Sequence, residues 1–318
     1  MKVVIYGRSD SSAKVIFDKI LGPIEPLDKC VSISFDHNPD EEIPRADYKV
    51  LLLWEPSVVM PWQYKNENRQ RFDLVIPMSY WRALELGYEE YSFQEYVPPG
   101  YRISPWQFRT KRIVMINSAK FSASTKSNYG LRRKVSKALF ESGVAYELYG
   151  DNWKESFLTS FRKRVSAIRN ALRAGESISL CETFSEMLYK FPEHRGSISR
   201  KEAILGDSEL SLVIENQSDT VTEKLFDSIF AGAVPVYVGP DLKTQFPYLE
   251  QCVVRAEPSV EKILERIKNL TDMELDSKRK ALEKFLNQKG ESGIGFWDPI
   301  NVWSKAAEII QKRVIALF

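Results

Sequence analysis

The stretch IENQSDTVTEKLFDSIFAGAVPVYVGP, residues 214–240, places a run of polar side chains before an apolar helix and a short strand. Its first residues end the apolar run LSLVIEN at 210–216, which is typical of a buried parallel strand. Apolar residues then recur at helical spacing over 225–230, so we expect a helix to begin near Thr222. VPVYVG at 234–239 predicts the next strand. The stretch is therefore a strand, helix and strand unit with its polar groups gathered between the first two elements.

The same alternation of strands and helices runs along the whole chain. In the first half, apolar runs with the length and β-branched content of buried parallel strands lie at 2–7, 30–35, 48–54 and 72–78. In the second half, the corresponding elements are a helix at 130–143 and strands at 112–118, 145–150, 210–216 and 234–239. Between the halves, segment 95–108 carries three prolines and a glycine, a composition that interrupts both helix and strand. The series predicts an α/β fold with two Rossmann-like domains facing a central cleft.

The domain limits follow from this series and from the length. A chain of 318 residues exceeds what one hydrophobic core usually fills. We expect an N-terminal domain at 1–105 and a C-terminal domain at 106–295 that contains an inserted basic helical segment near 154–205. A final helix at 296–318 carries an apolar stripe that includes Trp303, and we expect it to pack back onto the first domain.

The inserted segment contains FLTSFRKRVSAIRNALRA at 157–174. Its pattern predicts a helix with a core-facing stripe that includes Phe161 and Leu172, and with most of its basic residues, among them Arg164, outside the stripe. Such a run is usually a solvated face. The alternative is contact with an anionic acceptor or a lipid-linked glycan at a membrane surface.

Charge and hydropathy narrow the class of protein. Lys and Arg number 45 against 43 Asp and Glu, so no strong net field attracts the chain to nucleic acid or to a membrane. The apolar run at 50–54 is much shorter than the roughly 20 residues of a membrane span, and the first residues indicate a strand instead of a signal peptide. A cytoplasmic location is the resulting expectation.

Cysteine and histidine usage indicates neither a disulfide framework nor a metal centre. Cys30, Cys181 and Cys252 are odd in number and widely spaced, so we interpret them as ordinary buried thiols. His37 and His194 lack metal-ligand spacing, and their polar contexts are typical of surface residues. No Asp-x-Asp triplet occurs in the chain. A reaction that builds charge on a diphosphate would then depend on fixed cations and backbone donors.

The polar groups of the opening stretch suit a phosphate group. Glu215 and Asn216 follow a strand, and Glu223 and Lys224 begin a helix. A helix N-terminus offers unpaired N–H groups and partial positive charge, which favours phosphate binding, and Lys224 would add a full charge. The simpler interpretation is a capped helix in which Glu223 complements the helix dipole and Lys224 is solvated.

Residues 215–240 resemble the motif of the α-1,3/1,4-fucosyltransferases, a glycosyltransferase family 10-like pattern. The similarity comprises the acid and Asn pair, the Thr-Glu-Lys-Leu helix start, and Val-Pro-Val with a later Gly-Pro. GLRRKVSKALFESGVAYELYG at 130–150 resembles the upstream part of the same domain, and YKVLLLWEPS at 48–57 resembles, more weakly, a strand that ends in an acid. Thr220 stands where the family usually has Tyr, which removes an aromatic contact to the donor.

The resemblance implies a metal-independent, inverting glycosyltransferase of the GT-B class, without a cofactor. It would transfer fucose from GDP-fucose to a sugar hydroxyl of an oligosaccharide or glycoconjugate acceptor, which the N-terminal domain would bind. Alternatives left open are a glycosyltransferase that uses another nucleotide sugar and a non-catalytic binder of nucleotide sugar or glycan.

The resemblance also assigns residues. Glu223 would hold the ribose hydroxyls of the donor, and Glu215 and Asn216 would line the sugar side of the pocket. Lys224 and Arg132 would neutralise the pyrophosphate, with Arg133 as the alternative to Arg132.

Glu55 is the candidate general base. It follows the apolar run at 50–54, so its carboxylate would stand at the carboxyl end of a buried strand, where partial desolvation raises the pKa of an acid. Such a base takes the proton of the acceptor hydroxyl. The alternative is a strand-end acid that starts a turn with Pro56.

Overall fold

The computed structural model describes residues 1–7, 11–26, 28–38, 40–93, 97, 105–191, 194–290 and 292–317. The chain divides into two compact units, each with one parallel sheet covered by helices. Unit 1 comprises Met1–Tyr96 and Phe296–Phe318, and unit 2 comprises Val97–Gly295. Most of the expected linker at 95–108 lies outside the described residues, and Trp106–Phe108 form a 3-10 helix.

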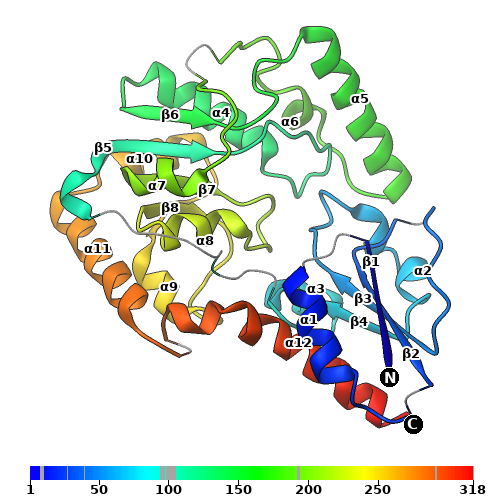
Figure 1. Cartoon of the computed structure of the whole chain (residues 1–318). Coiled ribbons are helices and arrows are strands. Elements are labelled where there is room, and N and C mark those ends of the chain that lie inside the picture. The colour runs from blue at the N-terminus through cyan, green and yellow to red at the C-terminus, as the bar shows by residue number, and fades with distance from the viewer. Residues whose placement is uncertain are drawn as a thin grey trace. The chain divides into compact units, whose positions relative to one another are not determined.

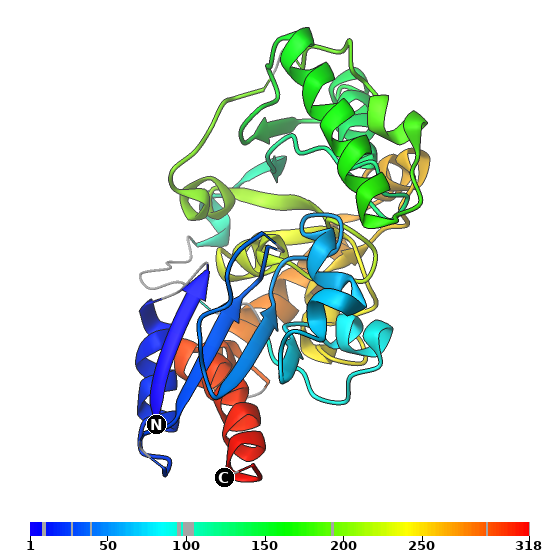
Figure 2. The ribbon, with the colours of Figure 1, turned by 90° about the vertical axis from the view of Figure 1, so that its right-hand side faces the viewer.

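Unit 1 has a four-stranded parallel sheet in the order β1-β2-β3-β4 (Figures 1 and 2). Its strands are β1 Lys2–Gly7, β2 Cys30–Phe35, β3 Tyr48–Leu53 and β4 Leu74–Pro77. Its helices are α1 Ser11–Leu21, α2 Asn66–Arg69, α3 Tyr80–Leu86 and α12 Pro299–Ile315, with a 3-10 turn at Pro61–Tyr64. The four strands expected in the first half of the sequence are thus present. The side chains of β2 and β3 are buried on both faces, as the near-continuous apolar runs predict, whereas those of β1 are half-buried or exposed.

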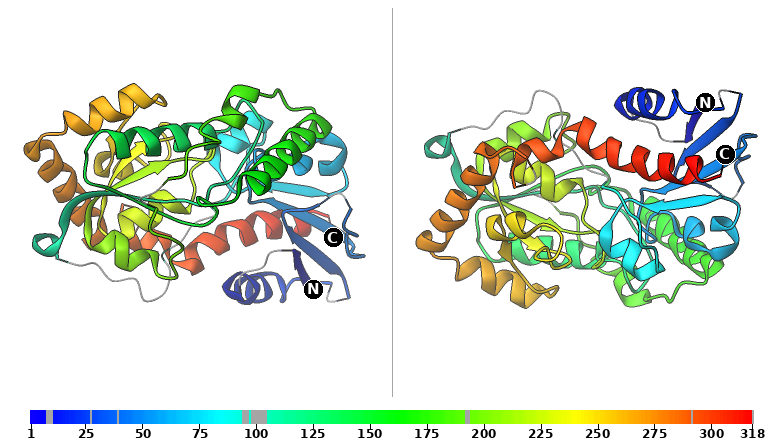
Figure 3. Two further views of the ribbon diagram at one scale, coloured as in Figure 1. Left: turned by 90° about the horizontal axis from the view of Figure 1, so that it is seen from above. Right: turned by 90° about the horizontal axis from the view of Figure 1, so that it is seen from below.

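The last helix of the chain belongs to the core of unit 1. Helix α12 packs against α1 (Figures 2 and 3), and its Trp303 is fully buried. The Trp303 ring lies 5.3 Å from that of Trp54 and 5.4 Å from that of Phe35, measured between centroids. The hydrophobic core of unit 1 therefore includes a helix that lies more than 200 residues after the strands it covers.

We predict that Trp303→Ala destabilises unit 1 by about 3–5 kcal/mol, because it removes a fully buried indole and leaves a cavity among aromatic rings. The control is Ile300→Ala on the same helix, since Ile300 is 63% exposed. Urea unfolding followed by circular dichroism measures both. Equal, small losses for the two variants would contradict the placement of α12 in the core.

Unit 2 has a five-stranded parallel sheet in the order β6-β5-β7-β8-β9 (Figure 1). Its strands are β5 Thr110–Ile116, β6 Tyr146–Tyr149, β7 Ser208–Ile214, β8 Val234–Val238 and β9 Val254–Arg255. Its helices are α4 Tyr129–Glu141, α5 Phe157–Ala174, α6 Leu180–Phe184, α7 Lys201–Gly206, α8 Glu223–Phe230, α9 Pro247–Cys252, α10 Val260–Lys268 and α11 Asp272–Asn287. Strand order reverses at β5, with β6 on one side and β7 on the other, which is the doubly wound pattern with a topological switch point between β5 and β7.

Helix α5 has the expected span but not the expected orientation. Phe161 and Leu172, predicted to face the core, are 41% and 58% exposed, whereas Arg164, predicted to lie outside the stripe, is 2% exposed. Hydrogen bonds explain why Arg164 is buried: its guanidinium donates to the carbonyls of Thr183 and Ser185, where α6 ends. Hydrogen bonds to a helix C-terminus, which the apolar pattern does not encode, turn α5 about its axis.

Two further expectations are wrong. His37 is 1% exposed instead of lying at the surface, because its ring packs edge-on against Phe72 at 5.3 Å between centroids. Cys181 is exposed instead of buried, since it lies on the outward side of the short helix α6, while Cys30 is half-buried and Cys252 is buried. Within the described part of the chain, no helix is long and apolar enough to cross a bilayer.

Candidate nucleotide-sugar site

A polar cavity of about 150 Å³ lies in unit 2, where β5, β6 and β7 end. The segments after these strands line it together with the first residues of α7 and α8 and the first turn of α4. This is the switch point of the sheet, where doubly wound folds bind ligands. Pockets that enclose a whole small molecule usually measure about 300–1,000 Å³. The cavity is therefore suited to a phosphate-sized group of a larger ligand.

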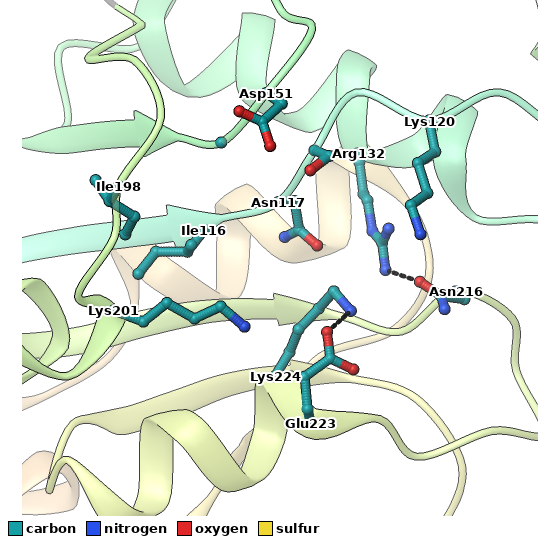
Figure 4. A pocket seen from close by; sticks show the side chains of 12 residues that line it. Ile116, Asn117, Lys120, Arg132, Asp151, Ile198, Lys201, Asn216, Glu223 and Lys224 are labelled. Carbon is teal, nitrogen blue, oxygen red and sulfur yellow. Dashed lines mark hydrogen bonds and ion pairs between the residues drawn. The ribbon is translucent and has the colours of Figure 1, made fainter. Parts of the chain in front are cut away.

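Positive charge predominates in the cavity lining. The side chains of Lys201, Lys224 and Arg132 point toward the space around Asn117 (Figure 4). The charged lining residues are Lys120, Arg132, Lys201 and Lys224 against Asp151 and Glu223. A cavity with such an excess of cations at helix N-termini stabilises bound anions.

Arg132 is held rigidly at the edge of the cavity. It is 3% exposed, its Nε donates to the carbonyl of Ile214 at 2.9 Å, and its Nη2 donates to Oδ1 of Asn216 at 2.9 Å. Its guanidinium also lies over the ring of Tyr129 at 5.1 Å. Burial lowers the pKa of Arg132. The guanidinium is thus fixed by neutral acceptors and keeps a charge that a ligand anion would neutralise.

Glu223 and Lys224 open helix α8 and interact with each other. The Lys224 ammonium lies 2.7 Å from Oε1 of Glu223 and 3.3 Å from the hydroxyl of Thr222. Burial raises the pKa of Glu223, but the charges of Lys224 and Lys201 outweigh it and hold this pKa below its usual range. The Lys224 side chain is only 16% exposed, so the interpretation of a solvated lysine does not describe it. Glu223 is 44% exposed and faces the cavity as a carboxylate.

Glu215 lies beneath the cavity and is not among its lining residues. Its side chain is fully buried, and its carboxylate accepts hydrogen bonds from the backbone N–H of Thr222 at 3.1 Å and from the Thr222 hydroxyl at 2.6 Å. Burial raises its pKa to about 7, against the opposing charge of Lys224. In this structure Glu215 fixes the start of α8, whereas Asn216 beside it lines the cavity.

Two glycines keep the strand ends close together. Gly150, after β6, has φ +124°, and a Cβ there would lie 2.1 Å from the carbonyl oxygen of Asn117. Gly239, after β8, would place a Cβ 2.7 Å from Cγ of Glu215. Both positions therefore require glycine for close approach, which explains the Gly-Pro at the end of the opening stretch.

Several cavity residues were not predicted from the sequence. These are Asn117, Ser118, Lys120, Asp151 and Lys201. Asp151 directly follows the strand predicted at 145–150, and Asn117, Ser118 and Lys120 lie at or just after the end of the strand predicted at 112–118. Their position at strand carboxyl ends is a usable signal. Asn117 is the most informative, because it is 4% exposed and its side-chain oxygen has no hydrogen-bond partner in the described structure. An unpaired buried polar atom in a cavity points to a missing ligand or water.

Arg133 does not share the cavity with Arg132. Its guanidinium donates to the carbonyls of Ser185, Lys120 and Glu182 on the other side of α4. Consecutive helix residues point about 100° apart, so only one of the two arginines can face a given cavity.

Glu55 belongs to unit 1, two residues after β3 ends. Its side chain is half-buried, and both its backbone N–H and its backbone carbonyl form hydrogen bonds with side chains. The N–H donates to Oδ1 of Asp36 at 2.9 Å, and the carbonyl accepts from Gln63 at 3.0 Å and Tyr64 at 2.9 Å. Asp36, which has φ +61° and a pKa raised by burial, also accepts from the N–H of Trp54. The loop that carries Glu55 is therefore well ordered by side-chain hydrogen bonds.

Comparisons with solved structures identify the fold. The chain is similar to Anabaena Alr3699/HepE, solved with UDP and glucose, at 11% identity and a TM-score of 0.53 over 98% of this chain and 99% of that one. It is also similar to trehalose-6-phosphate synthase, solved in a study of glycosyl transfer with retention, at 12% identity and a TM-score of 0.54 over 95% and 77%. The two sheets of α/β type are thus those of the GT-B glycosyltransferase fold.

A third similarity involves a much longer chain. Staphylococcus aureus TarM matches at 13% identity and a TM-score of 0.48 over 88% of this chain, and this chain spans only 55% of TarM. No protein-family model and no curated protein matches the sequence.

We predict that the buried carboxyl of Glu215 makes folding stability fall as pH rises. Its pKa of about 7 in the folded chain exceeds the ordinary 4.5, so the folded state binds more protons between these values and loses stability across that window. At about 1.4 kcal/mol per pH unit, the loss is about 3 kcal/mol. Glu215→Gln should remove this contribution: its amide oxygen can still accept from the backbone N–H of Thr222, and its NH2 group can donate to the Thr222 hydroxyl.

Urea unfolding of both proteins from pH 4.5 to 8 measures the difference. The wild type should become less stable relative to Glu215→Gln as pH rises. A constant difference would show that Glu215 stays ionised throughout.

Proposed function

We propose that this chain is a metal-independent glycosyltransferase that binds the diphosphate of a nucleotide sugar in the cavity of unit 2. The observation that carries the proposal is the convergence of Arg132, Lys201 and Lys224 at the switch point of the sheet. Breaking the bond between the sugar and the diphosphate develops negative charge on the leaving group, and preorganised cations stabilise that charge. The GT-B fold supports this assignment.

We further propose that the donor is GDP-fucose, which the resemblance of 215–240 to the fucosyltransferase motif favours. Glu223 would bind the ribose, since it is an exposed carboxylate at the helix start. The second candidate is a UDP-sugar, because UDP is the nucleotide named for HepE. Transfer would be inverting in the first case, with Glu55 as the base, and retention is the alternative that the trehalose-6-phosphate synthase similarity suggests.

We predict that the correct nucleotide raises the melting temperature of the chain. A ligand that binds only the folded state adds about 2.7 kcal/mol at 100 times its Kd, which corresponds to several degrees for a unit of this size. Differential scanning fluorimetry with GDP, GDP-fucose, UDP and UDP-glucose compares the candidates. A shift with UDP compounds alone would exclude the GDP-fucose proposal, and no shift with any of them would contradict the cavity assignment.

Transfer or donor hydrolysis should persist in EDTA if fixed cations supply the charge.

We predict that variants of the charged residues at the starts of α4 and α8 divide into two kinetic classes. Lys224→Ala and Arg132→Ala should lower kcat by about 10²-fold or more, because both cations face charge that grows in the transition state. Glu223→Ala should mainly raise the donor KM, since ribose contacts are similar in ground and transition states. Steady-state kinetics with the donor identified above measures each variant, with Lys268→Ala on the exposed side of α10 as the control. An effect of Lys224→Ala on KM alone would contradict the diphosphate placement.

The role of Glu55 is tested separately from donor binding. Glu55→Gln should abolish transfer and leave the melting shift with nucleotide unchanged, because a base acts on the acceptor hydroxyl. Unchanged transfer would show that Glu55 is not the base, and it would favour a mechanism with retention. A chain that binds nucleotide but neither transfers nor hydrolyses any donor would be a binding protein.

A further inference from the structure

A second and larger cavity lies in unit 2, on the other side of the segment that follows β5. It measures about 700 Å³ and is lined by residues of 119–121, 152–160 and 186–191, with Arg133 and Arg164. Residues 118 and 120 line the first cavity and 119 and 121 the second, as expected for an extended segment that separates them. Arg132 faces the first cavity and Arg133 the second.

Two buried arginines converge in this second cavity. Arg133 is 3% exposed and Arg164 is 2% exposed. Both donate to the carbonyl of Ser185, at 3.1 and 3.2 Å, and both guanidiniums lie over the ring of Phe121, at 5.0 and 4.5 Å from its centroid. Two like charges are thus held side by side out of water, where each disfavours the other.

Carboxylates compensate this pair only without direct contact, since the charges of Glu182 and Glu186 raise the pKa of Arg133 but less than burial lowers it. In the described part of the chain, neither arginine forms an ion pair, and the acidic side chains nearby are already engaged: Glu182 with Lys134, and Glu186 with Lys137. The carbonyls at the end of α6 supply about half of one negative charge, as a helix C-terminus does. Burial lowers the pKa values of Arg133 and Arg164 to about 9 and about 10, and the neighbouring charge of Arg164 contributes to the lower pKa of Arg133.

The pair also retains donors for a ligand. A guanidinium has five N–H donors. Arg133 makes four hydrogen bonds, through Nε, Nη1 and Nη2. Arg164 makes three, through Nε and Nη1 alone, so its Nη2 has no acceptor among the described residues. Guanidiniums with open donors bind oxyanions with directed hydrogen bonds.

The walls indicate what accompanies the anion. Aromatic side chains surround the cavity, with Trp153 and Tyr189 each packed 4.8 Å from Phe191. Glu155 lines it as well: one oxygen pairs with Lys163, and Oε2 is buried without a partner among the described residues. A buried acceptor of this kind needs a donor such as a hydroxyl group.

We propose that this cavity binds an acidic saccharide, whose phosphate or carboxylate contacts Arg133 and Arg164 and whose hydroxyl groups reach Glu155. A volume of about 700 Å³ accommodates a small oligosaccharide, within the usual range for ligand pockets. The existence of this site does not depend on the proposed function. That the saccharide is the acceptor does rest on it, and would place the acceptor in unit 2 instead of the N-terminal domain expected from the resemblance. The arginines of α4 then serve two different anions.

Saturation-transfer NMR with glucose 6-phosphate, glucuronate and glucose tests the site, because it detects weak binding. The two charged probes should bind and glucose should not, and the stronger of the two identifies phosphate or carboxylate as the group recognised. Arg164→Gln should weaken binding at least about tenfold. Arg162→Gln, on the exposed side of the same helix, should leave it unchanged. Equal binding by Arg164→Gln and wild type, or of glucose and the charged probes, would overturn the proposal.

A second pair of variants avoids the risk that Arg164→Gln does not fold. Leu188 lines the cavity and is 79% exposed, so its replacement disturbs no core. At low ionic strength, Leu188→Asp should weaken binding of the charged probes and Leu188→Lys should strengthen it, whereas Leu188→Asn serves as the neutral reference. Identical affinities for all three would contradict an anion in this cavity.

Titration with GDP and UDP separates this site from the proposed function. Saturating nucleotide should leave the charged probes bound, because the two cavities are distinct. Displacement by nucleotide would show that the second cavity belongs to the nucleotide site. If nucleotide binds and the acidic probes do not, this inference fails and the proposed function stands; the reverse result leaves the saccharide site and removes the transferase proposal.

Discussion

The buried guanidinium of Arg132 is the interaction on which the organisation of unit 2 depends. It joins the first turn of α4 to the last carbonyl of β7 and to Asn216. Because α4 follows β5, this contact ties the ends of the two strands at the switch point, and the cavity forms between them. A buried cation bound to neutral acceptors is costly for folding, and groups with such perturbed pKa values cluster at functional sites. The same contact thus sets both the geometry and the charge of the candidate site.

Much of the fold was predictable because its signals are local and periodic. Every strand expected from an apolar run is present within a few residues, and α8 begins after Thr222, as its spacing indicates. Strand β9 has only two residues and gave no signal. The orientation of α5 could not be predicted, because Arg164 is buried through carbonyls at the end of α6, and no periodicity encodes such acceptors.

The candidate site was partly predictable for a related reason. Polar residues that follow strands and start helices gather at one edge of a parallel sheet, so Asn216, Glu223 and Lys224 could be placed from sequence order alone. Lys201 lies in a segment without a recognisable pattern, and only the tertiary fold brings it to the cavity. For Glu215 the predicted position at a strand end was correct, but the direction of its side chain was not. The side chain turns inward and accepts hydrogen bonds from Thr222 instead of lining the cavity. A residue's place in an element does not determine the direction of its side chain.

The consecutive residues Arg132 and Arg133 face the two different cavities of unit 2. A helix presents consecutive residues to different directions, so a pair of arginines at one helix start reaches two sites at once. The first faces a cavity at the strand ends whose other walls supply lysines, which suits a diphosphate with several charges. The second faces aromatic walls and one other buried arginine, which suits a single oxyanion on a polyhydroxylated ring. Since both guanidiniums are anchored by backbone carbonyls, each keeps its direction without a ligand, and binding of either anion would cost little reorganisation. The helix start of α4 is therefore the structural link between the proposed donor site and the saccharide site.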